Sequence, residues 1–242
     1  MFPFPCPLEP PETARLRAEV RRQLLCAWPA LAHSPICRLE PAVLAEMLRL
    51  YDELFFDGLF ARRLPQLCVV GTPRMTRCAG KFCARVLADG TTDVQIRMST
   101  DFLFRLHEGP FSVNGIDACD ALEAFQLVFE HELCHAAEWA LYGACSAHRS
   151  TFRALSQGLF QHRTCTHALP TRAQEAAALG IGVGAHVSFP FEGRTLRGIV
   201  SRVGKTASVM VPSPVGAWHD KRGRRYVKYT VPLGLLTPQR RG

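Results

Sequence analysis

Hydrophobic side chains recur at intervals of three and four residues in four parts of the chain, which is the spacing of one face of an α-helix. Gly58 and Gly143 stand near the ends of the second and third parts, where glycine commonly terminates a helix. The pattern therefore predicts four amphipathic helices, the first of them an accessory helix. They cover residues 13–31, 40–60, 121–143 and 148–162.

Short apolar runs bounded by turn residues predict strands in two regions. In the first region an Asp-Gly turn joins two of the runs into a hairpin. In the second region glycines separate the runs. The runs are residues 67–71, 79–87 and 93–99 in the first region, and lie within 183–213 and 224–236 in the second.

A change of character near Pro170 divides the chain, because helices and short strands precede it and an alanine-rich connector with glycine-separated β runs follows it. We expect an α+β domain, with helices packed on a small β-sheet, followed by a small all-β barrel. The expected parts are an N-terminal extension with the accessory helix (1–39), the main domain (40–170), a linker (171–180) and the barrel (181–238).

Composition restricts the class of protein. The chain has 242 residues, of which 48% are hydrophobic and 21% charged, as is typical of a globular protein. No apolar run approaches the roughly 20 residues needed to span a bilayer, and the N-terminal residues do not resemble a secretory signal. We therefore expect a soluble intracellular protein with no membrane partner, located in the nucleus or nucleoid if it binds DNA and otherwise in the cytoplasm.

Net charge and cysteine content add two expectations. The formal net charge of +8 favours acidic partners such as nucleic acid, although the same charge also serves solubility. The ten cysteines include no CxxC pair and no compact framework. Reduced, mostly buried thiols are therefore expected rather than disulfides.

The third predicted helix carries an HExxH sequence, His131-Glu132-Leu133-Cys134-His135. Histidines four residues apart lie on one face of a helix, so both imidazoles can bind one zinc ion. His148 follows after a glycine-containing turn that can return the chain to the metal. Three histidines leave a fourth position for water, as in catalytic zinc sites.

This motif predicts peptide-bond hydrolysis with one Zn²⁺ ion and no covalent enzyme intermediate. The zinc would lower the pKa of its water ligand and polarise a scissile carbonyl, while Glu132 accepts the proton of the water and passes it to the leaving amine. A purely structural zinc site does not require the glutamate, so Glu132 favours an enzyme over a binding protein.

Two alternative ligand groups are less favoured. Glu138 lies about 10 Å along the helix axis from His131, too far to share one ion. Its carboxylate can hydrogen-bond a ligand histidine or be solvated, and we expect it to be solvated. His162, Cys165 and His167 match no common zinc spacing and are expected to be loop or helix-end residues.

Four sequence blocks, in this order, resemble the SprT-like metalloprotease family: LYDELFFDGLF (50–60), MTRCAGKFC (75–83), FEHELCHAAEWALYG (129–143) and AHRSTF (147–152). The resemblance covers about residues 42–165 and implies a zincin-like fold, with His131, His135 and His148 as ligands and Glu132 as the catalytic residue. Within the family, the spacing from His135 to His148 is most similar to that in the protease domain of germ-cell nuclear acidic protein. Spartan proteases have a longer connection.

Two further positions are assigned to the substrate cleft through this resemblance. Gly80 matches a family glycine on a strand near the cleft, where glycine admits a substrate backbone or marks a bulge. The family usually has glycine directly after the third histidine, whereas this chain has Arg149. Arg149 can narrow the cleft, select acidic substrates, or point outward at the start of a helix, and we expect the last.

The C-terminal region resembles the small SH3-like barrels appended to some SprT-like proteins, and the family is linked to cleavage of proteins crosslinked to DNA. After Gly193 the chain has eleven Lys and Arg against one Asp. Trp218, Tyr226 and Tyr229 either stack on exposed bases or pack the barrel core. The candidate phosphate-binding residues are Arg194, Arg197, Arg202, Lys205, Arg224, Arg225 and Lys228.

The sequence thus predicts a zinc-dependent endopeptidase acting on protein substrates, including proteins bound or crosslinked to DNA, with DNA or RNA as a partner of the C-terminal region. The alternative is a catalytically silent nucleic-acid or chromatin adaptor that keeps the zinc site, with Arg149 obstructing the cleft. Cleavage that requires zinc would favour the enzyme, and nucleic-acid binding without cleavage would favour the adaptor.

Overall fold

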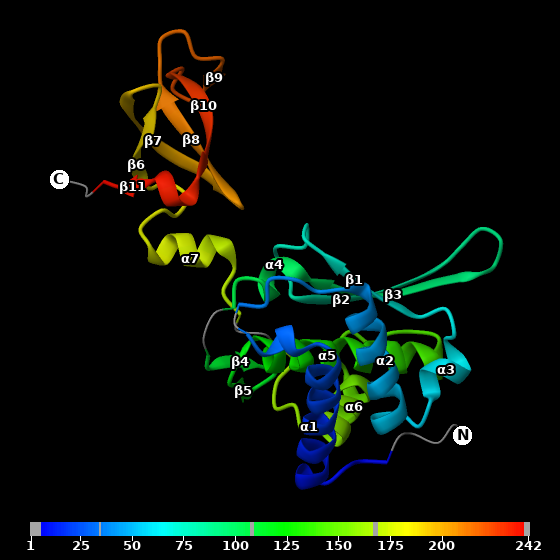
Figure 1. The fold of residues 1–242 in the computed structure, drawn as a ribbon. Helices are drawn as coiled ribbons and strands as arrows, with labels where there is room; N and C mark the ends of the chain where they lie inside the picture. The colour runs from blue at the N-terminus through cyan, green and yellow to red at the C-terminus, as the bar shows by residue number, and fades with distance from the viewer. Residues whose placement is uncertain (1–5, 34, 107–108, 167–168, 240–242) are drawn as a thin grey trace. The chain divides into compact units, whose positions relative to one another are not determined.

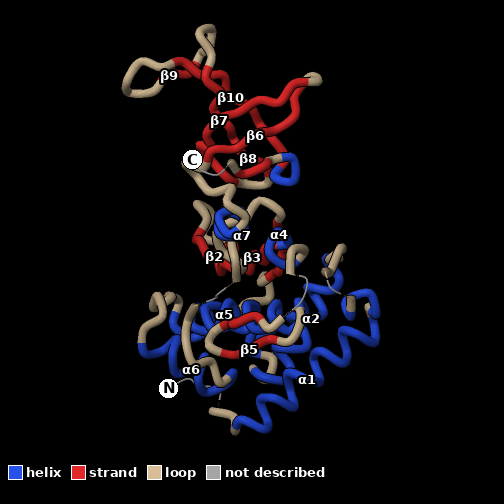
Figure 2. The backbone as a smooth tube through the Cα atoms, turned by 90° about the vertical axis from the view of Figure 1, so that its left-hand side faces the viewer, coloured by secondary structure: helices blue, strands red, loops and turns tan. Residues whose placement is uncertain are grey.

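The computed structural model describes residues 6–33, 35–106, 109–166 and 169–239. The chain forms two compact units, Met1–Leu169 and Pro170–Gly242. Figure 2 shows that most of the helix, in blue, belongs to the first unit, whereas the second unit consists mainly of strands, in red. The protein is therefore an α+β unit joined to a largely β unit.

Helices are the main secondary structure of the first unit (Figure 1). Proline in the first turn begins both α1 and α2, where its missing N–H costs no hydrogen bond. Gly143 ends α5 in the left-handed conformation, as its sequence position predicts. The helices are α1 (Pro10–Ala27), α2 (Pro41–Phe55), α3 (Leu59–Arg63), α4 (Thr100–Leu103), α5 (Ala121–Tyr142) and α6 (Ser150–Phe160), with a 3-10 turn, η1, at Pro29–Ala32.

The helix predicted over residues 40–60 is broken in two. Gly58 adopts a left-handed φ of 70° between α2 and α3. The carboxylate of the buried Asp52 accepts hydrogen bonds from the backbone N–H groups of Phe60 and Ala61, at 2.8 Å each. These bonds satisfy the first turn of a new helix, so the chain changes direction although the apolar periodicity continues.

A three-stranded sheet lies against the helices. It consists of β1 (Cys68–Thr72), β2 (Gly80–Val86) and β3 (Thr92–Ser99) in the order β1-β3-β2. β3 pairs in parallel with β1 and antiparallel with β2, as the Asp-Gly turn predicts for the latter pair. The order leaves β2 at an edge, which places one row of its backbone groups outside the sheet. A short hairpin, β4 (Phe111–Val113) and β5 (Ile116–Ala118), was not predicted.

Helix α5 is the centre of the first unit and packs against β2, β3, β5 and α6. Leu127, Phe129 and Leu133 are fully buried, although they lie on different sides of the helix. At its start, Asp120 accepts a hydrogen bond from the N–H of Glu123 and an ion pair from Arg21 of α1. Apolar surroundings on several sides fix the orientation of the buried α5 side chains.

Helix α1 belongs to the core of the first unit rather than to a separate extension. Its Leu16, Val20 and Leu24 are buried in the same hydrophobic cluster as the side chains of α2 and α5. Its Arg17 makes two hydrogen bonds of 2.7 Å to Glu130 of α5, a carboxylate that is completely buried. Burial raises the pKa of Glu130, but Arg17 and His162 outweigh this and hold the pKa below its usual value.

The second unit is an antiparallel sheet with a short helix. The strand order is β11-β6-β7-β8-β10-β9. Its core includes Val187, Val209 and Val231, and also Ala176 from α7. The region expected to be a linker (171–180) therefore contains a helix that belongs to this unit. The elements are α7 (Arg172–Ala178), β6 (His186–Phe191), β7 (Arg194–Val203), β8 (Thr206–Pro212), β9 (Trp218–His219), β10 (Arg225–Pro232), η2 (Leu233–Leu235) and β11 (Thr237–Pro238).

The ten cysteines are all free thiols, but the expectation that most are buried is wrong. Only Cys134 is buried, Cys83 and Cys165 are partly buried, and the other seven are exposed. Thiol burial depends on tertiary contacts that the scattered positions do not reveal. Among the described residues, no helix is long and apolar enough to cross a membrane.

Replacing Arg17 with Met should lower the free energy of unfolding of the first unit by about 3–5 kcal/mol, because it leaves the buried Glu130 carboxylate without its cation. Urea unfolding followed by the helical circular dichroism signal measures this, since most of the helix is in this unit.

Two variants provide controls for this prediction. Arg22→Met removes an exposed arginine of α1 that pairs with Glu19, and should change stability by less than about 1 kcal/mol. The double variant Arg17→Met/Glu130→Gln should recover part of the loss. Equal effects of Arg17→Met and Arg22→Met would show that Arg17 does not compensate a buried charge.

Candidate metal centre

Three histidines converge at one point beside α5. His131 and His135 lie one turn apart on the helix, and His148 comes from the loop that joins α5 to α6. The Nε2 atom of His148 is 3.0 Å from that of His131 and 3.1 Å from that of His135. The structure therefore brings together all three ligands that the sequence predicts, in a group able to hold one metal ion.

The geometry of the three nitrogens fits a zinc ion. Two ligand nitrogens bound to one tetrahedral zinc at 2.0–2.1 Å are about 3.3 Å apart, close to the distances observed here. Burial and the neighbouring His148 lower the pKa of His135, so its imidazole is neutral at physiological pH and keeps a lone pair for a metal. Residues His131, His135 and His148 would hold the ion.

A strained backbone and an aromatic ring position His148. Ala147 and His148 both have left-handed φ values, 50° and 65°, which residues with a side chain adopt at a cost. The ring of Phe152 in α6 packs against all three imidazoles, with centroids 4.8, 4.5 and 4.7 Å away. Phe152 is the last residue of the AHRSTF block, but the sequence did not reveal this role.

Glu138 is buried, and the expectation that it is solvated is wrong. Its side chain is 1% exposed, and its carboxylate accepts hydrogen bonds from the backbone N–H and the hydroxyl of Ser146. One carboxylate oxygen lies 3.6 Å from Nδ1 of His135. Glu138 thus faces the ring nitrogen opposite the metal side, and also ties the His148 loop to α5.

Glu132 points toward the edge strand β2. Its carboxylate accepts a 2.6 Å hydrogen bond from the backbone N–H of Phe82, and the side chain is 4% exposed. Burial raises the pKa of Glu132 to about 7, against the effect of the Phe82 hydrogen bond. A carboxylate next to the ligand His131, with a pKa near neutrality, has the properties of a general base.

Gly80 makes room for Glu132. A Cβ atom at this position would lie 2.6 Å from Oε1 of Glu132 and 2.9 Å from Cγ1 of Val128. The β2–β3 register runs without interruption from Gly80 to Val86, so the glycine does not mark a bulge. The side chain of Glu132 occupies the space that a side chain at position 80 would need. The sequence did not suggest this contact.

Arg149 precedes α6 with φ −80° and ψ −163°, a conformation that any residue can adopt. The left-handed positions are the two residues before it, so the backbone does not require glycine at position 149. The side chain is exposed.

Among the described residues, His162 and Cys165 do not belong to the group of three converging histidines. His162 is 2% exposed and its Nε2 lies 3.0 Å from the Glu130 carboxylate, which makes it part of the buried ion-pair network. Cys165 is partly buried against the core. His167 lies outside the described residues.

The aromatic residues of the second unit take different positions. Tyr226 is 7% exposed and donates its hydroxyl to Asp220, and Tyr229 contacts the rings of Phe189 and Phe191. Both therefore pack within the unit. Trp218 is 53% exposed, and Nζ of Lys228 lies 5.0 Å from its ring centroid.

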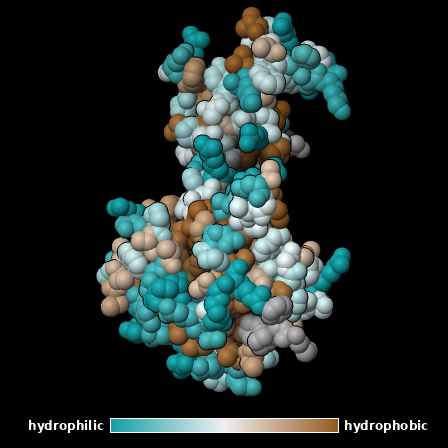
Figure 3. Space-filling model, turned by 90° about the vertical axis from the view of Figure 1, so that its right-hand side faces the viewer, coloured by the Kyte–Doolittle hydropathy of each residue, from teal (hydrophilic) through white to brown (hydrophobic). Residues whose placement is uncertain are grey.

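The seven candidate phosphate-binding residues are all exposed. Arg224 pairs with Asp220, at 2.9 Å. The others are distributed along β7, the turn after it and β10. Figure 3 shows one face of this unit, on which hydrophilic side chains predominate and hydrophobic groups lie singly between them.

Comparisons with known proteins agree with the geometry. The sequence model of the SprT-like family matches residues 44–173, more than half of the chain. A comparison with curated proteins found no match. The expected likeness to germ-cell nuclear acidic protein rather than Spartan therefore stays a prediction. The extent of the family match and the converging histidines lead to one conclusion: this chain belongs to the SprT-like family.

Proposed function

We propose that the chain is a zinc-dependent endopeptidase. The observation that carries this proposal is the convergence of three imidazole Nε2 atoms, 3.0–3.1 Å apart, with a buried glutamate next to one of the ligands in the sequence. Membership of the SprT-like family supports it. A structural zinc site would use four protein ligands, whereas this group offers three.

The residues of the chain have separate tasks in this mechanism. When bound, zinc lowers the pKa of a water ligand and polarises the scissile carbonyl. Glu132 takes the proton of the attacking water and delivers it to the leaving amine, and the Phe82 N–H holds the carboxylate in place meanwhile. Glu138 and Phe152 keep the imidazoles of His135 and His148 oriented.

The unpaired edge of strand β2 is evidence that the substrate is an extended polypeptide. Its outer row of backbone groups is not used by β3, and one of these groups, the Phe82 N–H, already bonds Glu132. A substrate strand added to this edge would lie next to the catalytic carboxylate. Hydrogen bonds to the backbone do not depend on substrate sequence, so protein rather than one specific peptide is the expected substrate.

Replacing Glu132 with Gln should lower kcat/KM for cleavage of an unfolded, DNA-bound protein by at least about a hundredfold. The variant should still bind one zinc ion per chain. The amide keeps the shape of the side chain but cannot accept the proton. Zinc content by mass spectrometry and fragment release by gel electrophoresis are measured on the same samples.

A chelated sample serves as the control and should lose cleavage in the wild type, with recovery when zinc is restored. If both proteins bind zinc and neither cleaves any of a varied set of substrates, the chain is an adaptor that retains the metal site rather than a protease.

Replacing Gly80 with Ala should reduce kcat/KM by at least about tenfold, because its methyl group displaces the Glu132 carboxylate from the Phe82 N–H. Gly158→Ala in α6 is the matched control. Its added Cβ would meet only ordinary contacts, 3.6 Å from Pro7. Equal activity in the two variants would show that the position of Glu132 is not set by β2.

We also propose that the second unit is an SH3-like barrel that binds nucleic acid. Its six-stranded antiparallel sheet supports the barrel, and the exposed Trp218 under Lys228 supports binding through base stacking and charge. Tyr226 and Tyr229 are omitted from this proposal because Tyr226 is buried and Tyr229 packs against Phe189 and Phe191.

Replacing Trp218 and Lys228 together with Ala in the full chain should weaken binding of a single-stranded oligonucleotide by about tenfold or more. It should also make the dependence of log K on log salt shallower by about 0.7, because one phosphate contact is lost. Fluorescence anisotropy at several salt concentrations gives both values. Arg22→Ala in the first unit is the control, and identical affinities would show that this surface does not bind nucleic acid.

A further inference from the structure

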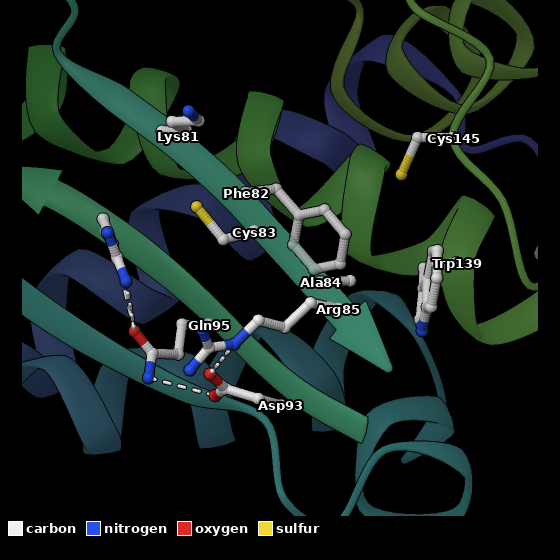
Figure 4. A pocket seen from close by; sticks show the side chains of 10 residues that line it. Lys81, Phe82, Cys83, Ala84, Arg85, Asp93, Gln95, Trp139 and Cys145 are labelled. Carbon is white, nitrogen blue, oxygen red and sulfur yellow. Dashed lines mark hydrogen bonds and ion pairs between the residues drawn. The ribbon is translucent and has the colours of Figure 1, made fainter. Parts of the chain in front are cut away.

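A groove of about 460 Å³ runs along the edge strand β2 (Figure 4). Its walls come from β2, from β3, from the last turns of α5 and from the loop after α5. Phe82 and Trp139 form its apolar part, and Lys81, Arg85 and Arg97 are its cations. None of these residues belongs to the metal centre.

The groove begins at the catalytic candidate. Phe82, which lines it, donates its backbone N–H to Glu132. Cys145, on the opposite wall, donates its thiol to the carbonyl oxygen of the ligand His135 at 3.5 Å. Trp139 lies one helical turn beyond His135. A polypeptide held at the metal centre along β2 would therefore continue into this groove.

The two sides of β2 present different kinds of side chain to the groove. Side chains alternate along a strand, so Phe82 and Ala84 lie on the same side as Gly80, which faces Glu132 of α5. Lys81, Cys83 and Arg85 lie on the other side. Figure 4 shows Phe82 directed toward Trp139 and Cys145, while Arg85 meets Asp93 of β3 on the opposite side.

The side away from α5 has excess positive charge. The register pairs Lys81 with Arg97, and Arg85 with Asp93. Asp93 is bonded to Arg85 at 3.0 Å, and Gln95, not a carboxylate, accepts from Arg97 at 3.3 Å. Within the described ranges no carboxylate lies within ion-pair distance of Lys81 or Arg97. Three cations against one carboxylate leave two positive charges to be compensated.

We propose that this groove is a substrate subsite that selects an acidic side chain near the scissile bond, next to a large apolar residue. The inference rests on the proposed protease function and specifies its substrate. Because side chains alternate along an extended chain, the acidic residue and its apolar neighbour occupy adjacent positions of a strand paired to β2. The apolar neighbour packs between Phe82 and Trp139.

A polypeptide accounts for the groove better than a nucleic acid does. The free edge of β2 offers backbone groups for pairing with a strand, and Phe82, Ala84 and Trp139 give the groove an apolar side. A nucleic-acid strand would use the cations but not the backbone edge.

The test uses fluorogenic peptides that are identical except for Glu, Gln or Lys at each of the four positions on either side of the cleaved bond. At one or more of these positions, wild type should cleave the Glu peptide with a kcat/KM about tenfold above that of the Lys peptide. The variant Lys81→Glu/Arg97→Glu should reverse this order. Arg22→Glu, an equally exposed arginine change on α1, should leave it unchanged.

A second readout separates this inference from the proposed function. Anisotropy of the labelled peptides with Glu132→Gln measures binding without cleavage, and should show the same preference for Glu. Absence of cleavage together with a Glu preference in binding would contradict the protease but keep the subsite. Equal binding and cleavage of the Glu and Lys peptides would overturn the subsite. Oligonucleotide binding that is lost in Lys81→Glu/Arg97→Glu, together with equal affinities of the Glu and Lys peptides, would assign the cations to nucleic acid and overturn the subsite.

Discussion

The first unit depends on the interactions of one buried carboxylate, that of Glu130. It receives two hydrogen bonds from Arg17 of α1, one from the hydroxyl of Tyr51 in α2, and lies 3.0 Å from Nε2 of His162, just after α6. A carboxylate without solvent is tolerated only when such partners surround it. Glu130 therefore fixes three other elements around α5, one residue before the first histidine of the metal centre.

The three histidines and Glu132 are held from two sides, by helix α5 and by strand β2. On the helix side, α5 sets the spacing of His131 and His135, and Glu138 holds Ser146 so that the loop returns with His148. On the sheet side, β2 approaches so closely that a glycine is required at position 80 and a backbone N–H reaches Glu132. The first support sets the geometry of the three histidines, and the second sets the position of the Glu132 carboxylate next to the sheet edge.

The two units differ in how they use charge. In the first unit the important charges are buried and paired, as with Arg17 and Glu130, so they set geometry. In the groove along β2 and on the surface of the second unit, most of the cations are exposed, and in the groove they outnumber the nearby carboxylates. Exposed charge of one sign contributes little to stability and much to the choice of partner.

The sequence by itself determined the local features. The periodicity of apolar residues and the glycines at helix ends predicted the helices that became α1, α2, α5 and α6, and the HExxH spacing predicted a histidine pair on one helix face. These features follow from contacts within a few residues, where helix and strand geometry is fixed. The glycine-containing turn after this helix predicted the return of His148, the family resemblance supported it as the third ligand, and the structure brings it to the other two histidines.

Only the tertiary structure decided the rest, because it depends on residues far apart in sequence. It made α1 part of the core through the Arg17–Glu130 pair, 113 positions apart, and it buried Glu138, which the sequence placed in solvent. It also filled the space above Gly80 with Glu132. In the second unit it buried Tyr226 and left Trp218 exposed. Burial and close approach are properties of the packed chain, and no local pattern in the sequence specifies them.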